Sequence, residues 1–355
     1  MKKIHIKNIT LGCDPEFFFS KNGKIIGSEK VIKNNNSQII IDGVQAELNP
    51  SASSCRQSLA EHISSCFRSL NEMIKKDDTI KIDTATTIKI DPKELKSLSK
   101  NSQRFGCAPS KNKDGDGKIK IKDASKYYYR SAGGHIHLGS YENPKILVPI
   151  LDIIVGNTCV LIDRDKGNII RRKIYGKAGE YRTPPHGLEY RTLSNFWLRD
   201  YKLMSFVMGL ARMAVSIVDS SKIYKTKGGS FLWWKRKGKT IGHNYAKQLL
   251  DVVNMKDINK AINTNDYKLA LKNFKKIEPI LNEIIPTRDA WSVLAPLDKT
   301  NIKYFKYFAK KGLNYWFKNN DIINHWTKCS KAVGWETFLK TTVKDDYNKK
   351  RKNGI

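Results

Sequence analysis

The segment RSAGGHIHLG, residues 130–139, alternates apolar and polar side chains and carries two histidines, His135 and His137, two residues apart. In a β-strand, residues i and i+2 point to the same side of the sheet. Both imidazoles would then face one way, while Ile136 and Leu138 face the other. The segment therefore predicts a strand that is apolar on one side and ionisable on the other.

Three further segments repeat this spacing of polar residues. They are CDPEFFF (13–19), AELNPS (46–51) and LEYRTL (188–193), and their intervening residues are apolar or small. Alternation alone is common in half-exposed antiparallel sheets, but four pairs of different chemistry, each close to Gly or Pro, favour a shared active-site floor. The polar pairs, with the one above, are Asp14 and Glu16, Glu47 and Asn49, His135 and His137, and Glu189 and Arg191.

The fold class predicted from these patterns is α+β, with a mostly antiparallel sheet, a polar face, and helices on its other side. Asn22-Gly23 predicts a tight hairpin turn, and Asp42-Gly43 interrupts a second strand region. Further predicted elements, in chain order, are a helix over 59–74 entered through the serines at 51, 53 and 54, a strand over 79–91, an exposed loop over 111–118, a buried helix over 143–162, a lid or disordered loop over 164–187, and a helix from Asp200.

Length and charge limit the organisation and the partners. The 355 residues suffice for a sizeable core, and we predict a catalytic domain over 1–225 and a mostly helical, basic region over 226–355. The formal charge of +31 favours anionic partners, and a secondary affinity for nucleic acid is expected from it. Because the lysines are scattered, a diffuse basic surface is favoured over a dedicated nucleic-acid face.

Six cysteines, none in a CxxC pair, indicate a reducing setting. The basic N-terminus lacks the apolar core of a signal peptide, and no apolar run approaches the ~18 residues of a membrane-spanning helix. These observations predict a soluble, cytoplasmic protein without a membrane partner.

The ionisable residues suggest nucleotide-phosphate chemistry. Carboxylates such as those of Glu16, Glu47 and Glu189 suit Mg²⁺ or Mn²⁺, which keep coordination positions for phosphate, and imidazole can complete such a site. Arg182 and Arg191 could clamp phosphate or carboxylate and neutralise charge that develops in phosphoryl transfer. Other arginines of the polar passage, Arg171 and Arg172, are candidate nucleotide-binding residues.

The motifs LGCDPEFFF, DGVQAELNPS, FGC, GGHIHLG and YRTPPHGLEYRTLSNFW occur in this order between residues 10 and 215. Together they resemble the phage-encoded carboxylate-amine ligases of the second, phiEco32-like type, a group similar to glutamine synthetase and glutamate-cysteine ligase. The stretch APSKNKDGDGK after FGC departs from the acid-rich sequence of relatives, so no substrate contact is carried over to it.

The resemblance implies a curved, glutamine synthetase-like sheet whose concave face binds ATP and two or three divalent ions. It implies amide formation between a carboxylate and an amine through an acyl phosphate, in the host cytoplasm if the chain is phage-encoded. The substrates could be an amino acid, a peptide or a protein side chain. The residues carried over are Glu16, Glu47, Glu189 and at least one of His135 and His137 as metal ligands, with Arg182 and Arg191 as contacts of phosphate or the substrate carboxylate.

Two other classes of function stay open on the sequence. A metal enzyme of another kind is one: His135, His137 and Glu142 have the H-x-H-x4-E spacing of cupins, and a zinc hydrolase could add His186 or Glu189 as a third ligand. The other is a non-enzymatic, basic nucleic-acid or virion-associated protein, suggested by the charge and by SFLWWKRKGK (230–239).

Overall fold

The structure is a computed structural model that describes residues 9–33, 37–105, 111–112, 126–140, 142–222, 244–284, 305, 309–313 and 322–328. Several predicted features lie outside these residues. They are residues 113–118 of the loop predicted over 111–118, Gly106 and Cys107 of FGC, the aromatic and basic segment 230–239, and most of the chain beyond 284. The first two residues of that predicted loop, Lys111 and Asn112, form a short strand instead, paired with residues 180–181.

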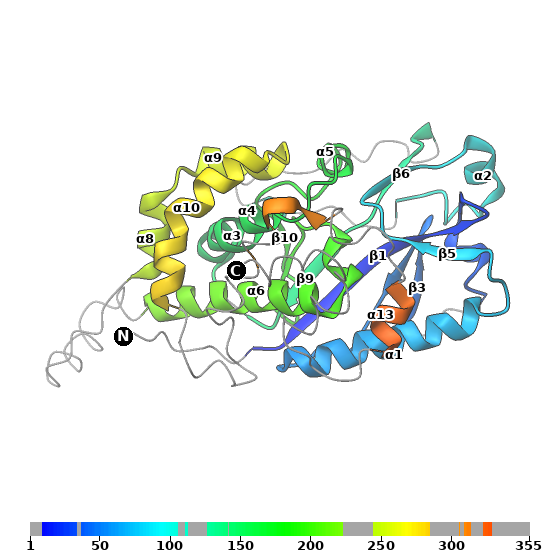
Figure 1. The fold of residues 1–355 in the computed structure, drawn as a ribbon, viewed down its shortest axis with the longest axis horizontal. Helices are drawn as coiled ribbons and strands as arrows, with labels where there is room; N and C mark the ends of the chain where they lie inside the picture. Colours follow the sequence, from blue (N-terminus) through cyan, green and yellow to red (C-terminus); the bar gives the residue numbers. More distant parts are fainter. Residues whose placement is uncertain are drawn as a thin grey trace, which may run out of the picture.

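An antiparallel sheet lies at the centre of the described part of the chain, with the long strand β1 (Leu11–Lys21) in its middle (Figure 1). The strands run in the order β3-β4-β1-β9-β11-β10-β7, and β2 and β5 pair with the second half of β1. Separately, β6 pairs with β8. The bounds are β2 Lys24–Ile26, β3 Ile39–Asp42, β4 Gln45–Leu48, β5 Ile80–Asp83, β6 Thr87–Lys89, β7 Lys111–Asn112, β8 Tyr129–Ser131, β9 Gly134–Leu138, β10 Glu180–Arg182 and β11 Leu188–Tyr190.

Helices cover the apolar face of this sheet. Among their contacts, α1 packs on β1, α6 on β9 and α3 on β11. The residues that alternation assigns to this face are buried, at most 1% exposed: Phe17, Phe19, Ala46, Leu48, Ile136, Leu138, Leu188 and Tyr190. The α-helices are α1 Arg56–Ile74, α2 Pro92–Ser97, α3 Pro144–Leu151, α4 Asn157–Val160, α5 Gly167–Arg171, α6 Tyr201–Lys222, α8 Tyr245–Val252, α9 Met255–Asn263, α10 Tyr267–Ile284 and α13 Ile322–Lys328, with 3-10 turns η1 Ser28–Lys30 and η4 Asn195–Arg199.

The predicted α+β class and the mostly antiparallel sheet are confirmed. Asn22 and Gly23 both have positive φ and connect β1 to β2, and Gly43, also at positive φ, lies in the turn between β3 and β4. The buried helix from Pro144 is formed by α3, the π-helical turn η3 (Asp152–Gly156) and α4 in succession. Asp152 of this turn accepts a hydrogen bond from the Tyr190 hydroxyl at 2.8 Å, which ties the helix to β11.

Three local predictions need correction. Helix α1 begins after Cys55 rather than at a serine, and Ser53 instead accepts a hydrogen bond from the Cys55 amide at 3.1 Å. The predicted strand over 79–91 is divided into β5 and β6, because the Asp83 carboxylate accepts from the Ala85 amide and turns the chain. The passage 164–187 is not a structureless lid, since it contains α5 and β10 and buries Arg171.

The described C-terminal helices α8, α9 and α10 lie together at one end of the molecule (Figure 1). Contacts join α10 to α4 and α8 to α6, so the three helices share a hydrophobic core with the sheet. Within the described ranges, no helix combines the length and the apolar character needed to cross a membrane. The division of domains at residue 225 stays a prediction.

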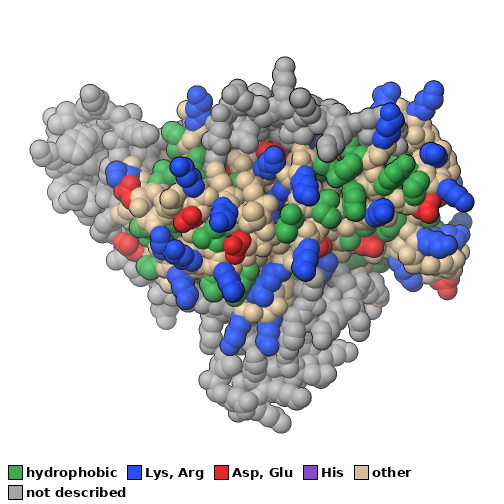
Figure 2. All heavy atoms as spheres, turned by 90° about the horizontal axis from the view of Figure 1, so that it is seen from above, with side chains coloured by type: hydrophobic (Ala, Val, Ile, Leu, Met, Phe, Trp, Pro, Cys, Tyr) green, Lys and Arg blue, Asp and Glu red, His purple; other side chains and the backbone are tan. Residues whose placement is uncertain are grey.

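The surface carries the basic charge in a dispersed form. Figure 2 shows Lys and Arg side chains spread across the visible face among hydrophobic and acidic ones, with no single dense basic patch over the described elements. This arrangement agrees with a solvated basic surface on the face in view.

Candidate active site

Strand register brings six of the eight residues of the predicted polar pairs onto one face of the sheet, whereas Asn49 follows the end of β4 and donates to the Ser37 carbonyl at 3.1 Å, and Arg191 follows the end of β11. Residues directly opposite each other in antiparallel strands point to the same side. The opposed pairs are Asp14 with His135, Glu16 with Glu47, and His137 with Glu189. These side chains come from four strands that are separate in sequence, and they form one ionisable surface opposite the helix-covered face.

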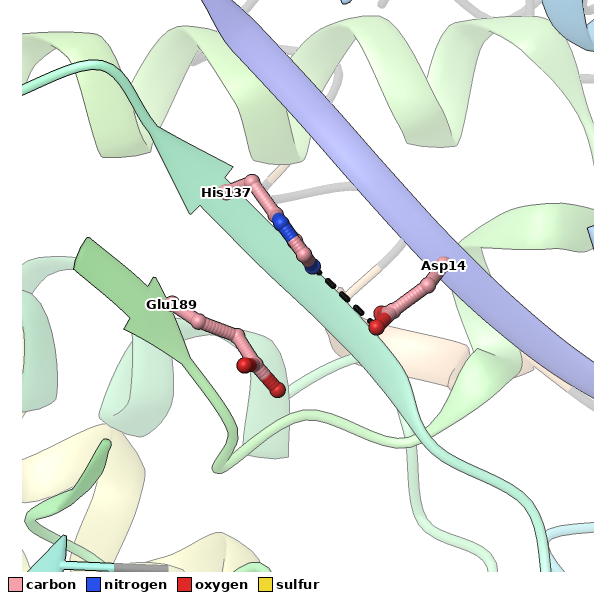
Figure 3. Close-up of side chains that lie close together, drawn as sticks. All are labelled: Asp14, His137 and Glu189. Carbon is pink, nitrogen blue, oxygen red and sulfur yellow. Dashed lines mark ion pairs between the residues drawn. The ribbon is translucent and has the colours of Figure 1, made fainter. Parts of the chain in front are cut away.

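Asp14, His137 and Glu189 form a group that we call the histidine cluster (Figure 3). Each offers one ligand atom, and these atoms lie within 4.8 Å of one another. Nε2 of His137 is 3.1 Å from Oδ2 of Asp14. His135 adjoins the cluster, because its Nδ1 is 3.1 Å from Oδ1 of Asp14 and 3.5 Å from Oε1 of Glu189. A mixed imidazole and carboxylate donor set suits a divalent transition metal such as Mn²⁺ or Zn²⁺.

Charges within the histidine cluster shift two pKa values. Burial would raise the pKa of Asp14, but the charge of His135 and the hydrogen bonds from both imidazoles outweigh it and hold this pKa well below its usual range. Burial would lower the pKa of His137, yet the hydrogen bond and charge of Asp14 raise it. Asp14 and His137 therefore stabilise each other as an ion pair, and a metal would have to displace the imidazole proton.

Glu16, Asp42 and Glu47 form a second group, the carboxylate cluster, whose ligand atoms also lie within 4.8 Å of one another. Asp42 was missed in the sequence because it reads as the start of the Asp42-Gly43 turn. The available signal was spacing: Ile40 lies opposite Glu47, so Asp42, two residues farther along β3, points to the same side. Three acids from three strands thus meet at one point.

The three acids of the carboxylate cluster repel one another, and the charges of Arg191 and Arg182 offset only part of this effect at Asp42. Burial raises the pKa of Glu47 to about 10, and the charges of Asp14, Glu16 and Asp42 add to this rise. Burial, and then the charge of Glu16, raises the pKa of Asp42 to about 7. Oδ2 of Asp42 is buried and has no hydrogen-bond partner among the described residues. Oxygen donors concentrated in this way fit a hard divalent cation such as Mg²⁺ or Mn²⁺.

Glu16 is held in place by groups from three other segments. Its Oε2 accepts a hydrogen bond from the Gly133 amide at 2.7 Å and from the Tyr175 hydroxyl at 3.0 Å. The Asn195 side chain donates to the Glu16 carbonyl at 2.8 Å. Sequence patterns gave no indication of Tyr175, which belongs to none of the alternating strands.

Two of the predicted arginines lie beside the histidine cluster. Nε of Arg191 is 3.1 Å from Oε1 of Glu189, and the Arg191 side chain is only 1% exposed. Nε of Arg182 is 3.5 Å from Oε2 of Glu189, and its side chain is 31% exposed. Arg182 lies opposite Glu189 on β10, so it points to the same face. Of the two, Arg182 is the more accessible to an anionic ligand.

Arg171 and Arg172 lie beneath this surface rather than on it. The guanidinium of Arg171 is fully buried and donates to the carbonyls of Thr192 and Arg191, both at 2.9 Å. That of Arg172 donates to the Asn265 side chain at 3.1 Å. Arg171 thus joins backbone carbonyls and Arg172 joins a side chain of the loop after α9, and nucleotide binding by either arginine stays a prediction.

The glycines before the histidines serve close packing. A side chain at Gly134 would collide with the carbonyl of Ser194 and with Nε1 of Trp197, which donates to the Gly134 carbonyl at 3.1 Å. A side chain at Gly133 would meet Nε2 of His135. Gly133 and Gly134 therefore let the turn after β11 and the imidazole approach the start of β9.

The structure also describes Glu142 and His186, the residues of the two alternative metal sites considered above. Glu142 belongs to neither of the two clusters formed by the described residues, which weakens the cupin-like arrangement. His186 stacks on His137 with ring centroids 5.2 Å apart, and its Nε2 is 3.0 Å from Nδ1 of His137. Next to these two rings lies a pocket of about 470 Å³ whose other polar side chains, including those of Thr10, Gln38 and Asn49, are uncharged.

Part of the chain matches a known protein family. Residues 116–284 match the sequence profile of the family described as "Phage phiEco32-like COOH.NH2 ligase-type 2". This match confirms, over those residues, the resemblance that the motifs indicate. It contains GGHIHLG and the segment around Glu189, extends through α10, and begins after the motifs on β1 and β4.

The remaining comparisons are distant. No curated protein matches the chain. Among solved structures, a bifunctional glutathione synthetase from Pasteurella multocida has a TM-score of 0.35 and 9% sequence identity, and the alignment covers 90% of this chain. The chain spans 55% of the length of that protein.

Proposed function

We propose that this protein is an ATP-dependent carboxylate-amine ligase that forms an amide bond on the polar face of a glutamine synthetase-like sheet. The family match supports joining of a carboxylate to an amine. The observation that carries the proposal is the pair of ligand clusters, which share β1 through Asp14 and Glu16. Two adjacent cation sites beside arginines are suited to binding a nucleoside triphosphate next to the carboxylate of a substrate.

In the proposed reaction, an oxygen of the substrate carboxylate attacks the γ-phosphorus of ATP and gives an acyl phosphate and ADP. The amine nitrogen then attacks the acyl carbon, phosphate leaves, and the nitrogen loses a proton. The first step brings an anionic carboxylate to an anionic triphosphate, and the second develops negative charge on the departing phosphate, so charge neutralisation is the main requirement. Divalent ions, when bound, would supply much of that positive charge.

The residues of the chain would divide this work. Glu16, Asp42 and Glu47 would hold one ion, and Asp14, His137 and Glu189 a second, with His135 supporting Asp14. Arg182 would contact a phosphate or the substrate carboxylate, because its side chain is the accessible one. Arg191, whose side chain is buried, would hold Glu189 in position and add positive charge to the site. The neutral pocket beside His137 offers room for one of the reactants.

We propose the following for the domains, the location and the substrates. Residues 1–225 would form the ligase domain, and α8–α10 would complete its core while the rest of the basic C-terminal region has a separate role. The reaction would take place in the cytoplasm, on small-molecule, peptide or protein substrates.

An ADP-release screen tests the function directly. Purified protein is incubated with ATP and Mg²⁺ or Mn²⁺ against panels of carboxylic acids and amines, and products are identified by mass spectrometry. Glu16→Gln and Glu189→Gln should abolish ADP release while leaving the circular dichroism spectrum intact. Glu61→Gln, a change on the exposed side of α1, is the matched control and should keep full activity. Wild-type turnover in either site variant would refute the assignment.

A zinc-dependent hydrolase is the second candidate, favoured by one observation. Nε2 of His186 is 3.0 Å from Nδ1 of His137, so a second imidazole is available next to the group of Asp14, His137 and Glu189 and would join it by a turn of the His186 side chain. Metal analysis of the purified protein separates the two candidates. Stoichiometric zinc that resists dialysis supports the hydrolase, whereas ATP-enhanced binding of Mg²⁺ or Mn²⁺ supports the ligase.

A further inference from the structure

The hydroxyl of Tyr175 lies between two acceptors at the edge of the carboxylate cluster. Its oxygen is 3.0 Å from Oε2 of Glu16 and 2.9 Å from the carbonyl oxygen of Ser131. Tyr175 lies between α5 and β10, in a part of the chain that supplies none of the clusters' ligands. Tyr175 therefore contacts the carboxylate cluster without belonging to it.

A phenol has one proton, so only one of the two acceptors can receive it. The carbonyl of Ser131 already accepts a hydrogen bond from the Gln45 side chain at 2.9 Å. Glu16 carries negative charge when ionised, and hydrogen bonds to a charged acceptor are the stronger ones. The proton of Tyr175 is therefore directed to Oε2 of Glu16, beside the hydrogen bond from the Gly133 amide.

The ring of Tyr175 is itself fixed by Arg171. The Arg171 guanidinium carbon lies 4.5 Å from the ring centroid, and the guanidinium is anchored on the carbonyls of Arg191 and Thr192. Gly176, at φ +81°, lets the chain turn directly over Arg171, since any side chain there would collide with this guanidinium. Arg171 and Tyr175 thus connect the end of β11 with Glu16 on β1.

We propose that Tyr175 is a positioning residue that holds Glu16 in its metal-binding orientation, and that Arg171 fixes Tyr175 relative to the histidine cluster. This inference rests on the proposed function, because it assumes that Glu16 binds a divalent ion. The phenol leaves the other carboxylate oxygen of Glu16 to the ion and prevents rotation of the side chain. Hydrogen-bonded partners of metal ligands commonly set metal affinity in this way.

The test is metal binding by Tyr175→Phe, which removes only the hydroxyl. Titration with Mn²⁺, followed by the electron paramagnetic resonance of the free ion, reports binding without any need for activity. Tyr245→Phe is the matched control, because its hydroxyl also donates to a carboxylate, that of Glu283 at 3.3 Å, away from the sheet face. Tyr175→Phe should weaken one class of Mn²⁺ site by roughly 10-fold and leave the other unchanged.

Three results would overturn the inference. Equal Mn²⁺ affinities in Tyr175→Phe and wild type would show that the hydroxyl positions nothing, while the proposed function would survive. A melting temperature in EDTA well below that of Tyr245→Phe would show a merely structural role. Absence of Mn²⁺ binding by the wild-type protein would refute the inference and the proposed two-metal site together. Arg171→Lys keeps the positive charge but cannot donate to both carbonyls in the geometry of a guanidinium. It should therefore weaken Mn²⁺ binding at the same class of site as Tyr175→Phe.

Discussion

Glu16 and Glu47 lie directly opposite each other on adjacent antiparallel strands, with both carboxylates on the same side of the sheet. Like charges in this relationship destabilise a sheet, and Asp42 adds a third acid within reach. Burial raises the pKa of Glu47 to about 10, and the neighbouring acids add to this rise. Folding therefore makes Glu47 hold a proton that it would lose in water, which is the behaviour of a site that a cation completes.

Removing one of these charges should stabilise the metal-free protein. Because the pKa of Glu47 is raised on folding above its ordinary value, the folded state binds the proton more tightly than the unfolded state. The resulting loss of stability is absent below the unfolded pKa, about 4.3, and grows as pH rises toward the folded value. In EDTA at pH 8, Glu47→Gln should melt above wild type, by about 2–4 °C for each kcal/mol gained.

Thermal melts of both proteins at pH 5 and pH 8 check this prediction. The difference in melting temperature between the two proteins should shrink at pH 5. At that pH, protonation of Glu47 lowers the free energy of unfolding of wild type only slightly. Glu61→Gln, on the exposed side of α1, controls for the general effect of removing one negative charge. If Glu47→Gln melts below wild type at pH 8 in EDTA, the proposed destabilisation by Glu47 and its neighbouring acids is contradicted.

Divalent ions should stabilise wild type more than a variant that lacks one of the carboxylate ligands. A ligand that binds only the folded state raises its stability by about 2.7 kcal/mol at 100 times its dissociation constant. Mn²⁺ or Mg²⁺ should therefore raise the melting temperature of wild type and raise that of Asp42→Asn less. The comparison variant is Asp251→Asn, whose exposed carboxylate pairs with Lys247 on helix α8, away from the sheet face. An equal response from Asp42→Asn and Asp251→Asn would exclude Asp42 as a ligand.

Arg182 and Arg191 should fail in different ways when they are changed. Arg182→Ala leaves a half-exposed position, so the fold should survive while kcat/KM for ADP release falls by roughly 100-fold through the loss of transition-state charge stabilisation. Arg191→Ala removes the buried partner of Glu189 and should also lower the melting temperature. Kinetics and melts of both variants distinguish the two roles, and a normal kcat/KM for Arg182→Ala would remove it from the site.

Gly134 should tolerate no side chain. A methyl group there would press on the Ser194 carbonyl and on the indole of Trp197, and overpacking of this kind costs about 1–3 kcal/mol. Gly12→Ala is the control, since its added carbon would have no neighbour closer than 3.3 Å. Urea unfolding of both variants measures the difference, and equal stabilities would contradict the close approach of the turn after β11.

Spacing by two residues in the sequence was sufficient to predict the sheet and its polar face. The alternation places Glu16, Glu47, His135 and Glu189 on one side because the strand repeat is two, whatever the neighbouring strands are. The same reasoning predicted the buried apolar face, and a long apolar run beginning near Pro144 predicted the α3 region. It was wrong where local hydrogen bonds end an element, as at Asp83, which divides a predicted strand.

Only the tertiary structure decided which polar residues meet. Register between strands far apart in sequence grouped the acids into two clusters, added Asp42 from what looked like a turn, and set Arg171 beneath the surface rather than on it. Tyr175 reaches Glu16 from a segment without periodicity. A sequence determines on which side of a strand a side chain lies, because that depends on neighbouring bonds, whereas the partner opposite it depends on how the whole chain packs.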